Sequence, residues 1–191
     1  MESGLLSLKE KLNLKGHITI LRHPAGSVAK FLELIRQGRI EEFLALQRQG
    51  EMAAETDNMI MGGSGTGTDI IGQWIGSSYL VAQGLTVVPI GINYGAIGTG
   101  SAAPTAADTQ LAAEYARTTV SFYQNSGFIL PTLQFFFSDA QLANGTYPEF
   151  ATFANASAAA NSGNIFNRAL FNTPYAKTGG TDTTVQAAFS I

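Results

Sequence analysis

Cysteine is absent from this chain of 191 residues, which excludes disulfide bonds and thiolate metal sites. Charged residues make up only 13% of the sequence, whereas about a quarter is usual in soluble domains. The most apolar stretch, residues 79–94, is interrupted by polar residues and glycines and is too short to span a bilayer. Residues 1–16 mix charges with scattered leucines and do not resemble a signal peptide. We therefore expect a soluble protein made in the cytoplasm, with no membrane partner.

The charges that are present are placed unevenly. Of the 25 charged residues (11 Lys and Arg plus 14 Asp and Glu), 15 lie in the first 55 positions. A soluble β domain with a Thr, Ser and Asn surface would explain the remainder, and so would a subunit whose faces are covered by neighbours. The scarcity of charge favours the second explanation. The net charge of −3 comes with no clustered basic patch, so we expect no nucleic-acid partner.

Residues 24–50 carry the pattern of a helical hairpin. Ser27 is the expected N-cap of its first helix and Gly38 the end of that helix, while the second helix is expected to end near Gly50. The apolar stripes of the two helices are Val28, Phe31, Leu32 and Ile35, then Ile40, Phe43 and Leu44. Each stripe must be buried, either on the β domain of the same chain or on a partner.

A glycine-rich loop, residues 62–67, precedes a predicted helix that begins at Thr68 and ends at Gly84. Ile71, Trp74, Ile75 and Tyr79 form the expected buried stripe of this helix. Bare amides before a helix favour anions, but the loop lacks the lysine of a phosphate-binding loop and no βαβ alternation surrounds it. We interpret the loop as a flexible turn and the helix as a core helix.

Beyond residue 84 the apolar residues recur with a period of two, which predicts strands. Together with two earlier segments, the expected strands are 15–21, 52–61, 85–94, 117–124, 128–137, 149–154, 164–171 and 182–191. Residues 125–127 are typical of a hairpin turn, and Pro131 indicates a sheet edge or a bulge. Ser138 and Gln141 fit a capping box before a short helical turn that stops at Asn144 and Gly145.

These signals predict a mainly β protein: an antiparallel β-sandwich with one core helix and an N-terminal helical hairpin insertion. We divide the chain into an N-terminal segment with the first strand (1–23), the hairpin insertion (24–50) and a β-sandwich domain (51–191).

Residues that carry chemistry are sparse. His17 and His23 are the only histidines, and neither has a carboxylate at metal-ligand spacing. A serine-hydrolase triad would need one of them, and no G-x-S-x-G elbow occurs. Nearly all of the later carboxylates stand at expected helix starts or turns, where capping explains them: Asp57, Asp69, Asp108, Glu114, Asp139, Glu149 and Asp182. We predict no catalytic, cofactor-binding or metal site, and no enzymatic activity.

Phe136 breaks the alternation of its strand, because it points opposite to Phe135 and Phe137. Both faces of that strand are therefore apolar, so it is either covered on both sides or part of an interface. The predicted interface residues are Phe31, Leu32, Ile35, Phe43, Leu44 and Phe136. An exposed aromatic platform for sugars is an alternative, with Tyr94, Tyr147 and Tyr175 as its candidates.

The order of several segments resembles a family of small structural proteins of tailed-bacteriophage virions, of the tail-fibre or minor virion type. The segments are TDNMIMGGSGTGTDIIGQWI, YGAIGTGSAAPTAADTQLAAEYART, FSDAQLANGTYPEFATFANASAAANSGNIFNRALF and TDTTVQAAFSI. The resemblance covers residues 50–191 and the strand at 14–20. The matching residues are Asp57, Asn58, Gly98, Gly100, Pro104, Asp108, Leu111, Glu114, Arg117, Asn144, Gly145, Thr146, Glu149, Phe153, Arg168, Ala169, Leu170 and Phe171. The helical hairpin departs from the family pattern.

The resemblance implies a virion component with a β-sandwich body and no enzymatic activity. The expected location is the neck, the tail or the fibre-attachment region, and the expected partners are other virion structural proteins and copies of the same chain in an oligomer or symmetric ring. A capsid decoration or head-fibre protein and a host-glycan-binding module are the alternatives.

Overall fold

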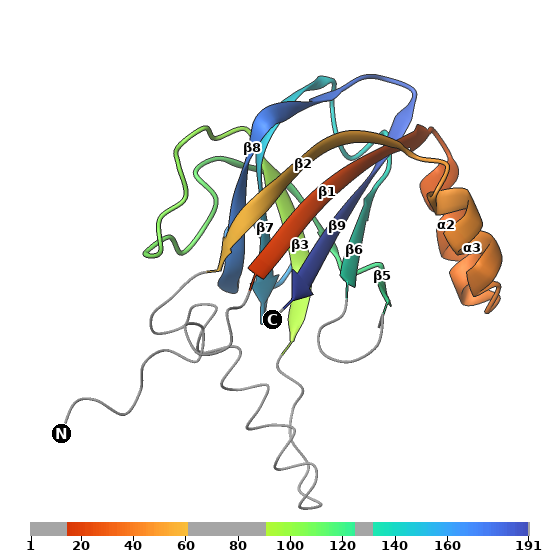
Figure 1. The fold of residues 1–191 in the computed structure, drawn as a ribbon, viewed down its shortest axis with the longest axis horizontal. Helices are drawn as coiled ribbons and strands as arrows, with labels where there is room; N and C mark the ends of the chain where they lie inside the picture. The colour runs from red at the N-terminus through yellow and green to blue at the C-terminus, as the bar shows by residue number, and fades with distance from the viewer. Residues whose placement is uncertain (1–14, 61–90, 125–131, 191) are drawn as a thin grey trace, which may run out of the picture.

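Strands dominate the part of the chain that the structure describes. The computed structural model describes residues 15–60, 91–124 and 132–190 (Figure 1). The elements are β1 (Lys15–Pro24), α2 (Ser27–Arg36), α3 (Ile40–Gln47), β2 (Glu51–Ile60), β3 (Ile92–Gly98), β4 (Glu114–Thr119), β5 (Phe122–Gln124), β6 (Thr132–Phe137), β7 (Gly145–Ala154), β8 (Asn164–Lys177) and β9 (Thr181–Ser190). The predicted mainly β class is confirmed. The predicted glycine loop, core helix, turn at 125–127 and Pro131 lie outside the described residues.

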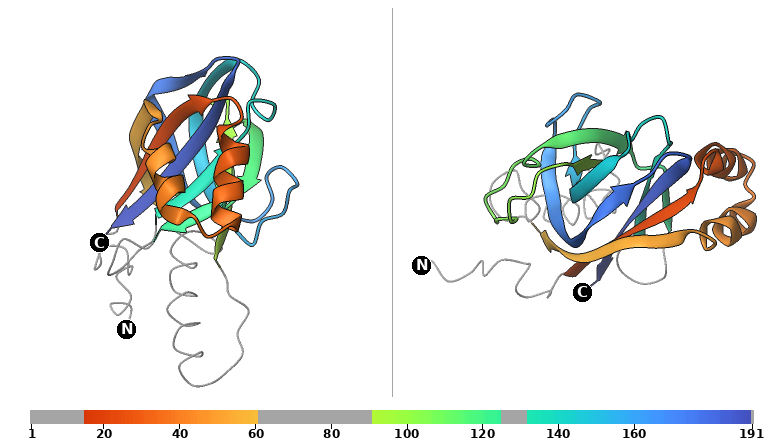
Figure 2. Two further views of the ribbon diagram at one scale, coloured as in Figure 1. Left: turned by 90° about the vertical axis from the view of Figure 1, so that its right-hand side faces the viewer. Right: turned by 90° about the horizontal axis from the view of Figure 1, so that it is seen from above.

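The strands form two antiparallel sheets that meet at β2. Their hydrogen-bonded order is β4-β3-β7-β8-β2-β1-β9-β6-β5. β2 pairs along most of its length with β1, and its last two residues pair with Asn167 and Arg168 of β8. The order begins and ends with β4 and β5, which are consecutive in the chain. The two ends of the order are thus neighbours along the chain, and seen from above the strands curve around a shared interior (Figure 2).

Most described strands lie where alternation predicts them, and β1, β7 and β8 are longer than predicted. The expected strand 117–124 is instead two strands, β4 and β5, because the chain changes sheets between them. The Val120 N–H donates to the Asn93 carbonyl beside one sheet, and the Ser121 N–H donates to the Gln134 carbonyl of the other.

The segment after β6 is a turn, although the capping box predicts a short helical turn there. The capping contacts do form, because Gln141 Oε1 accepts the Ser138 N–H at 2.8 Å and the Ser138 hydroxyl at 3.0 Å. No helix follows within residues 138–144. Asp182 of β9 accepts the Asp139 N–H at 2.8 Å, which ties the turn to the sheet before β7 begins at Gly145.

Apolar side chains fill the space between the sheets and also cover part of each outer face. Between the sheets, Phe135 of β6 packs against Phe150 of β7, with ring centroids 5.5 Å apart. A second cluster contains Phe153 of β7 and Leu111, which comes from the segment between β3 and β4. A third contains Phe136 of β6 and the two helices. Each sheet is therefore packed on part of both faces.

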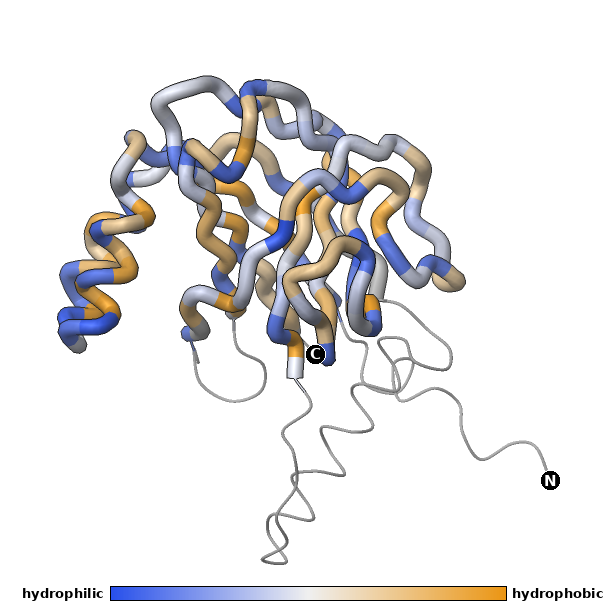
Figure 3. Tube along the Cα trace, turned by 180° about the vertical axis from the view of Figure 1, so that it is seen from behind, coloured by the Kyte–Doolittle hydropathy of each residue, from blue (hydrophilic) through white to orange (hydrophobic). Residues whose placement is uncertain are grey.

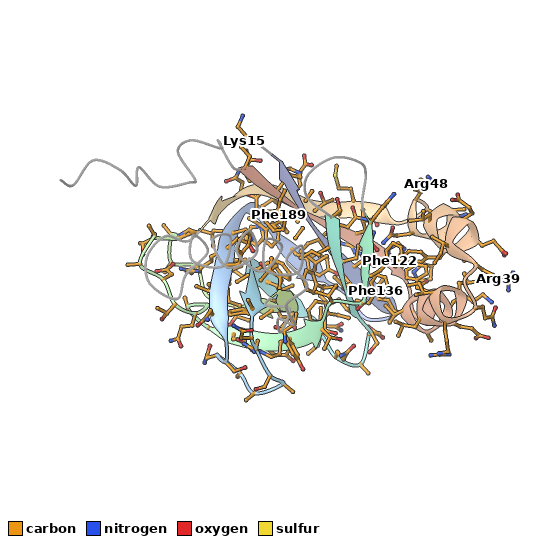
Figure 4. The ribbon with its side chains drawn as sticks, turned by 90° about the horizontal axis from the view of Figure 1, so that it is seen from below. Lys15, Arg39, Arg48, Phe122, Phe136 and Phe189 are labelled. Carbon is orange, nitrogen blue, oxygen red and sulfur yellow. The ribbon has the colours of Figure 1, made fainter. Side chains whose placement is uncertain are left out.

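The helical hairpin packs on its own chain. The rings of Phe31 in α2 and Phe43 in α3 lie 5.6 Å and 6.0 Å from the ring of Phe136, and Phe122 of β5 lies 4.8 Å from Phe43. Figure 4 shows Phe122 and Phe136 between the strands and the helices. Figure 3 shows the hydrophilic positions of the hairpin on the side away from the strands. The two apolar faces of β6 are thus both covered within one chain.

Two details of α2 differ from the prediction. Leu34 is 1% exposed, whereas Leu32, which the predicted stripe placed at i+4, is 39% exposed. The buried residues of α2 therefore recur every three positions, at Val28, Phe31 and Leu34. The N-cap is Gly26, whose φ of 89° favours glycine, and Ser27 is the first helical residue. Gly38 ends the helix as predicted, with a φ of 72° and the hydrogen-bond pattern of a Schellman motif.

A pair of buried amides joins α3 to β6 beside the aromatic cluster. Gln47 and Gln134 are 3% and 1% exposed, and their side chains exchange two hydrogen bonds. Because buried amides require partners, this pair specifies how the hairpin sits on the sheet.

We expect Phe136→Ala to lower the free energy of unfolding by about 3–5 kcal/mol, because it removes a packed ring between β6 and the hairpin. Leu32→Ala, on the outer side of α2, is the control and should change it by less than about 0.5 kcal/mol. Chemical unfolding followed by circular dichroism measures both values. Equal losses in the two variants would contradict the packing described above.

Candidate functional site

Most charged side chains of the β region are engaged in contacts within the chain. The structure describes nine charged residues after residue 55, and only Asp57 among them has a largely exposed side chain, at 93%. The other eight form three groups: Asp108, Glu149 and Arg168; Glu114 and Arg117; Asp139, Lys177 and Asp182. Each group joins a strand to an irregular segment. They are the candidate functional sites of this part of the chain.

Glu149 and Arg168 hold the segment between β3 and β4 against the sheet. The fully buried carboxylate of Glu149 accepts the N–H groups of Gly100, Ala112 and Ala113 at 3.0, 3.1 and 2.8 Å. Arg168 donates to the same carboxylate at 2.7 Å. The guanidinium also donates to the Ala102 carbonyl at 2.8 Å. Glu149 and Arg168 therefore supply hydrogen-bond partners for backbone groups near both ends of this segment.

Asp108 completes this group. It forms an ion pair with Arg168 and accepts the hydroxyl and the N–H of Thr105 at 2.7 and 3.0 Å. Burial alone would raise the pKa of Asp108, but the hydrogen bonds from Thr105 and Arg168 lower it below its usual value. Asp108 is therefore held in its charged form as part of a turn.

Two glycines make room for the Glu149 carboxylate. A Cβ at Gly98 would lie 2.5 Å from Glu149 Oε1, and a Cβ at Gly100 would lie 2.4 Å from the same atom. No side chain fits at either distance. The G-x-G spacing at 98–100 is thus a consequence of the buried carboxylate beside it.

Arg117 holds a second loop. Its guanidinium makes two hydrogen bonds to Glu114, at 2.6 and 2.7 Å, and both side chains are at most 4% exposed. The remaining nitrogen donates to the Ser157 carbonyl at 2.9 Å and to the Ser162 hydroxyl at 2.7 Å. The guanidinium also lies 5.0 Å from the ring centroid of Phe153. Arg117 thereby fixes the loop between β7 and β8.

Asp182 connects the hairpin to the β region. One carboxylate oxygen accepts the Val28 N–H at 2.8 Å and the other accepts the Asp139 N–H at 2.8 Å. A hydrogen bond from the buried ammonium of Lys177, helped by the Gly180 N–H, lowers the pKa of Asp139. The capping carboxylate of α2 thus comes from a strand 154 residues further along the chain.

All three groups are stabilising contacts in which the acceptors are already occupied by donors. Asp108 and Asp139 stand at turns, as their sequence positions indicate, whereas Asp182 lies in β9 and caps α2, which its sequence position does not indicate. Glu149 differs, because it lies inside β7 and pairs with an arginine. Sequence reasoning from periodicity missed these pairings. The available signal was the rarity of charge itself, since a lone charge in an apolar strand requires a partner.

His23 lies beneath the hairpin at the end of β1. It is 3% exposed, and its ring meets Phe31 edge-on at 5.0 Å. A Cβ at Gly50 would lie 2.3 Å from the ring, so glycine is required there. Burial lowers the pKa of His23, and the negative charge of Asp182 opposes this effect. The fold therefore favours neutral His23.

The structure brings together five of the six predicted interface residues: Phe31, Ile35, Phe43, Leu44 and Phe136. Phe31, Phe43 and Phe136 are at most 2% exposed, so no partner can reach them while the hairpin is packed. Leu32 is the one exposed member of the set. The apolar faces of the hairpin and of β6 cover each other within the chain, and docking of the set on a partner stays a prediction.

The tyrosines predicted for sugar binding do not form an exposed platform. Tyr147 and Tyr175 are 2% and 0% exposed, and Tyr94 lies against the guanidinium of Arg117 at 5.7 Å. Burial, and to a lesser degree the neighbouring Tyr115, raises the pKa of Tyr147 to about 12. Tyr115, by contrast, is 49% exposed. The strands turn the predicted rings inward, which sequence spacing alone did not show.

Among the helices that the structure describes, none is long and apolar enough to cross a membrane. Within residues 15–60, 91–124 and 132–190, no group of three acidic or histidine side chains could hold a metal ion. No family model, no curated protein and no solved structure matches the chain.

We expect Arg168→Leu to lower the free energy of unfolding by about 3–5 kcal/mol, because it leaves the buried Glu149 carboxylate without its cation. The control is Arg39→Leu, whose side chain and partner Glu42 are 46% and 57% exposed, and it should cost much less. Urea unfolding measures both. A cost for Arg168→Leu no larger than that of the control would contradict the role assigned to this pair.

Stability should fall between about pH 7 and pH 5 through His23. Because its pKa is lowered in the folded protein, the unfolded chain takes up the proton first as the pH drops below about 6.5. We expect His23→Phe to flatten the pH dependence of the melting temperature over this range. The same slope in wild type and His23→Phe would exclude this effect.

Proposed function

We propose that this chain is a structural subunit of a tailed-phage virion, in the neck, tail or fibre-attachment region, and that it acts by self-assembly and docking without catalysis. The observation that carries the proposal is how the β region uses its charges. Of the nine charged residues described after residue 55, eight hold loops, turns or a helix on the sheets. The segment resemblance described above supports the same assignment. The partners are other virion proteins and further copies of the chain.

An exterior with few charges suits a subunit that is enclosed by neighbours. Burying an unpaired charge in an interface is costly, whereas burying alanine, threonine or serine costs little desolvation. Few large apolar side chains are exposed in the described residues: Leu32, Met52 and Tyr115, on α2, β2 and β4. The contacts we propose are therefore broad and made of small side chains, on the order of 1,000 Å² or more each, and repeated by symmetry.

Loops that are fixed in advance also favour docking. The segment between β3 and β4 is held by Glu149 and Arg168, and the loop between β7 and β8 is held by Arg117. A surface that is already ordered loses less entropy on association than a flexible one. In this proposal the two sheets form the sandwich body, the hairpin is an insertion packed on its side, and the fixed loops are presented to neighbours.

Light scattering coupled to size-exclusion chromatography tests the assembly claim. We expect a defined oligomer whose population grows with protein concentration. Leu32→Asp, Met52→Asp and Tyr115→Asp each place a charge on a different exposed surface, and at least one should weaken association while melting as the wild type does. A tagged chain should also be recovered in purified particles. A monomer at every concentration, together with absence from the particles, would refute the proposal.

A further inference from the structure

Strand β4 is the first in the strand order, so one of its two edges has no neighbouring strand within the described residues. It pairs with β3 alone, and β3 then pairs with β7 on its other side. None of the residues of β4 is buried, whereas most residues of β7 are. The edge of β4 that faces away from β3 is therefore open to contact.

The register between β3 and β4 shows which backbone groups point to this open edge. In an antiparallel pair, residues that bond across the ladder alternate with residues whose N–H and C=O groups point the other way. The Val120 N–H donates to the Asn93 carbonyl, so the register places Thr119 and Arg117 in the outward positions. The Thr119 carbonyl accepts the Ser121 hydroxyl at 3.3 Å. The backbone N–H and C=O of Arg117 have no hydrogen-bond partner in the part of the chain that the structure describes.

A groove of about 280 Å³ lies along residues 114–117 of this strand. Its other walls are Gln141, from the turn after β6, and Ala158 and Ala160, from the loop between β7 and β8. These three residues are exposed, and so is Tyr115 in the groove. The loop and the turn therefore add only uncharged side chains to the surroundings of the open edge.

The charged side chains of β4 do not protect its open edge. Soluble proteins commonly prevent pairing between strand edges with exposed charged side chains, above all lysine. The charged residues of β4 are Glu114 and Arg117, and their side chains are only 2% and 4% exposed. They bind each other, and Arg117 also binds the loop at Ser157 and Ser162. A two-fold axis places like side chains close together, and here it would bring no exposed charges of the strand face to face.

We propose that β4 pairs with β4 of a second copy of the chain, antiparallel and about a two-fold axis close to Arg117. The backbone N–H and C=O of Arg117 in each copy then bond to those of the other copy, and the two sheets become continuous. The second copy also covers Tyr115, one of the few large apolar side chains that the described residues expose. A second copy is the fitting partner because antiparallel pairing about a two-fold axis satisfies both open edges at once. This inference rests on the proposed function, since it names the surface through which the chain self-assembles.

Amide hydrogen exchange, followed by NMR on the full chain at increasing protein concentration, tests the pairing. The Arg117 N–H should exchange at least about tenfold more slowly in the associated protein than in the dilute protein, because it gains an acceptor. The Ala116 N–H is the matched reference. It lies in the bonded position opposite Ile97, so its exchange should change far less. Light scattering on the same samples gives the associated fraction.

A charge placed in the groove should prevent the association. Ala160→Lys adds an ammonium group to the groove wall, and we expect this variant to stay monomeric at concentrations at which the wild type associates. Ala29→Lys adds the same charge at an exposed position of α2, and it should associate as the wild type does. Both variants should melt at the wild-type temperature, because both alanines are exposed.

Two results would overturn the inference: an oligomer in which the Arg117 N–H exchanges as fast as in the dilute protein, or equal association of Ala160→Lys and the wild type. Either result leaves the virion proposal standing, because the copies would then meet at another surface. A chain that stays monomeric but is recovered in purified particles would also refute this inference alone, and would leave the open edge to a strand of another protein. Pairing through β4 by a chain that purified particles lack would refute only the virion proposal.

Discussion

The carboxylate of Glu149 lies inside β7, fully buried, where it accepts three backbone N–H groups and pairs with Arg168. This arrangement constrains much of what surrounds it. Gly98 and Gly100 must lack side chains because the carboxylate occupies the space a Cβ would need. The two ends of the segment from residue 99 to 113 are then held at this carboxylate, and Leu111 packs in a cluster with Phe153. A buried charge is costly alone, so each of these contacts depends on the others.

The same physics explains the hairpin at the opposite side of the molecule. Phe136 points outward from β6, and an apolar ring on an outer face needs a cover. The hairpin supplies Phe31 and Phe43 for that purpose, and Asp182 ties the start of α2 to β9. Figure 1 shows the helices beside β5 and β6, whereas β7, the strand that carries Glu149, lies in the other sheet. The β region therefore exposes few charges. This property supports the role inside an assembly that we propose.

Alternation and capping rules located most of the described elements, because they act through neighbours in sequence. The period-two stretches became β6, β7, β8 and β9, and the stripes at Phe31 and Phe43 became α2 and α3. Errors arose where a distant residue decided the outcome. The strand predicted over 117–124 divides because its halves pair with different sheets. The predicted N-cap Ser27 is instead the first residue of α2, after Gly26, and the carboxylate that caps this helix belongs to Asp182 of β9.

The chain by itself determined the class of the protein, the place of the hairpin and the rarity of charge, since composition and periodicity are local properties. Only the tertiary structure decided which charges pair, since Glu149 and Arg168 are 19 residues apart and Arg168 and Asp108 are 60 apart. It also decided that the face of β6 carrying Phe136 is covered from within, because the nearest apolar surface to that ring belongs to the same chain. Partner choice across a fold depends on strand order and register, which no short stretch of sequence contains.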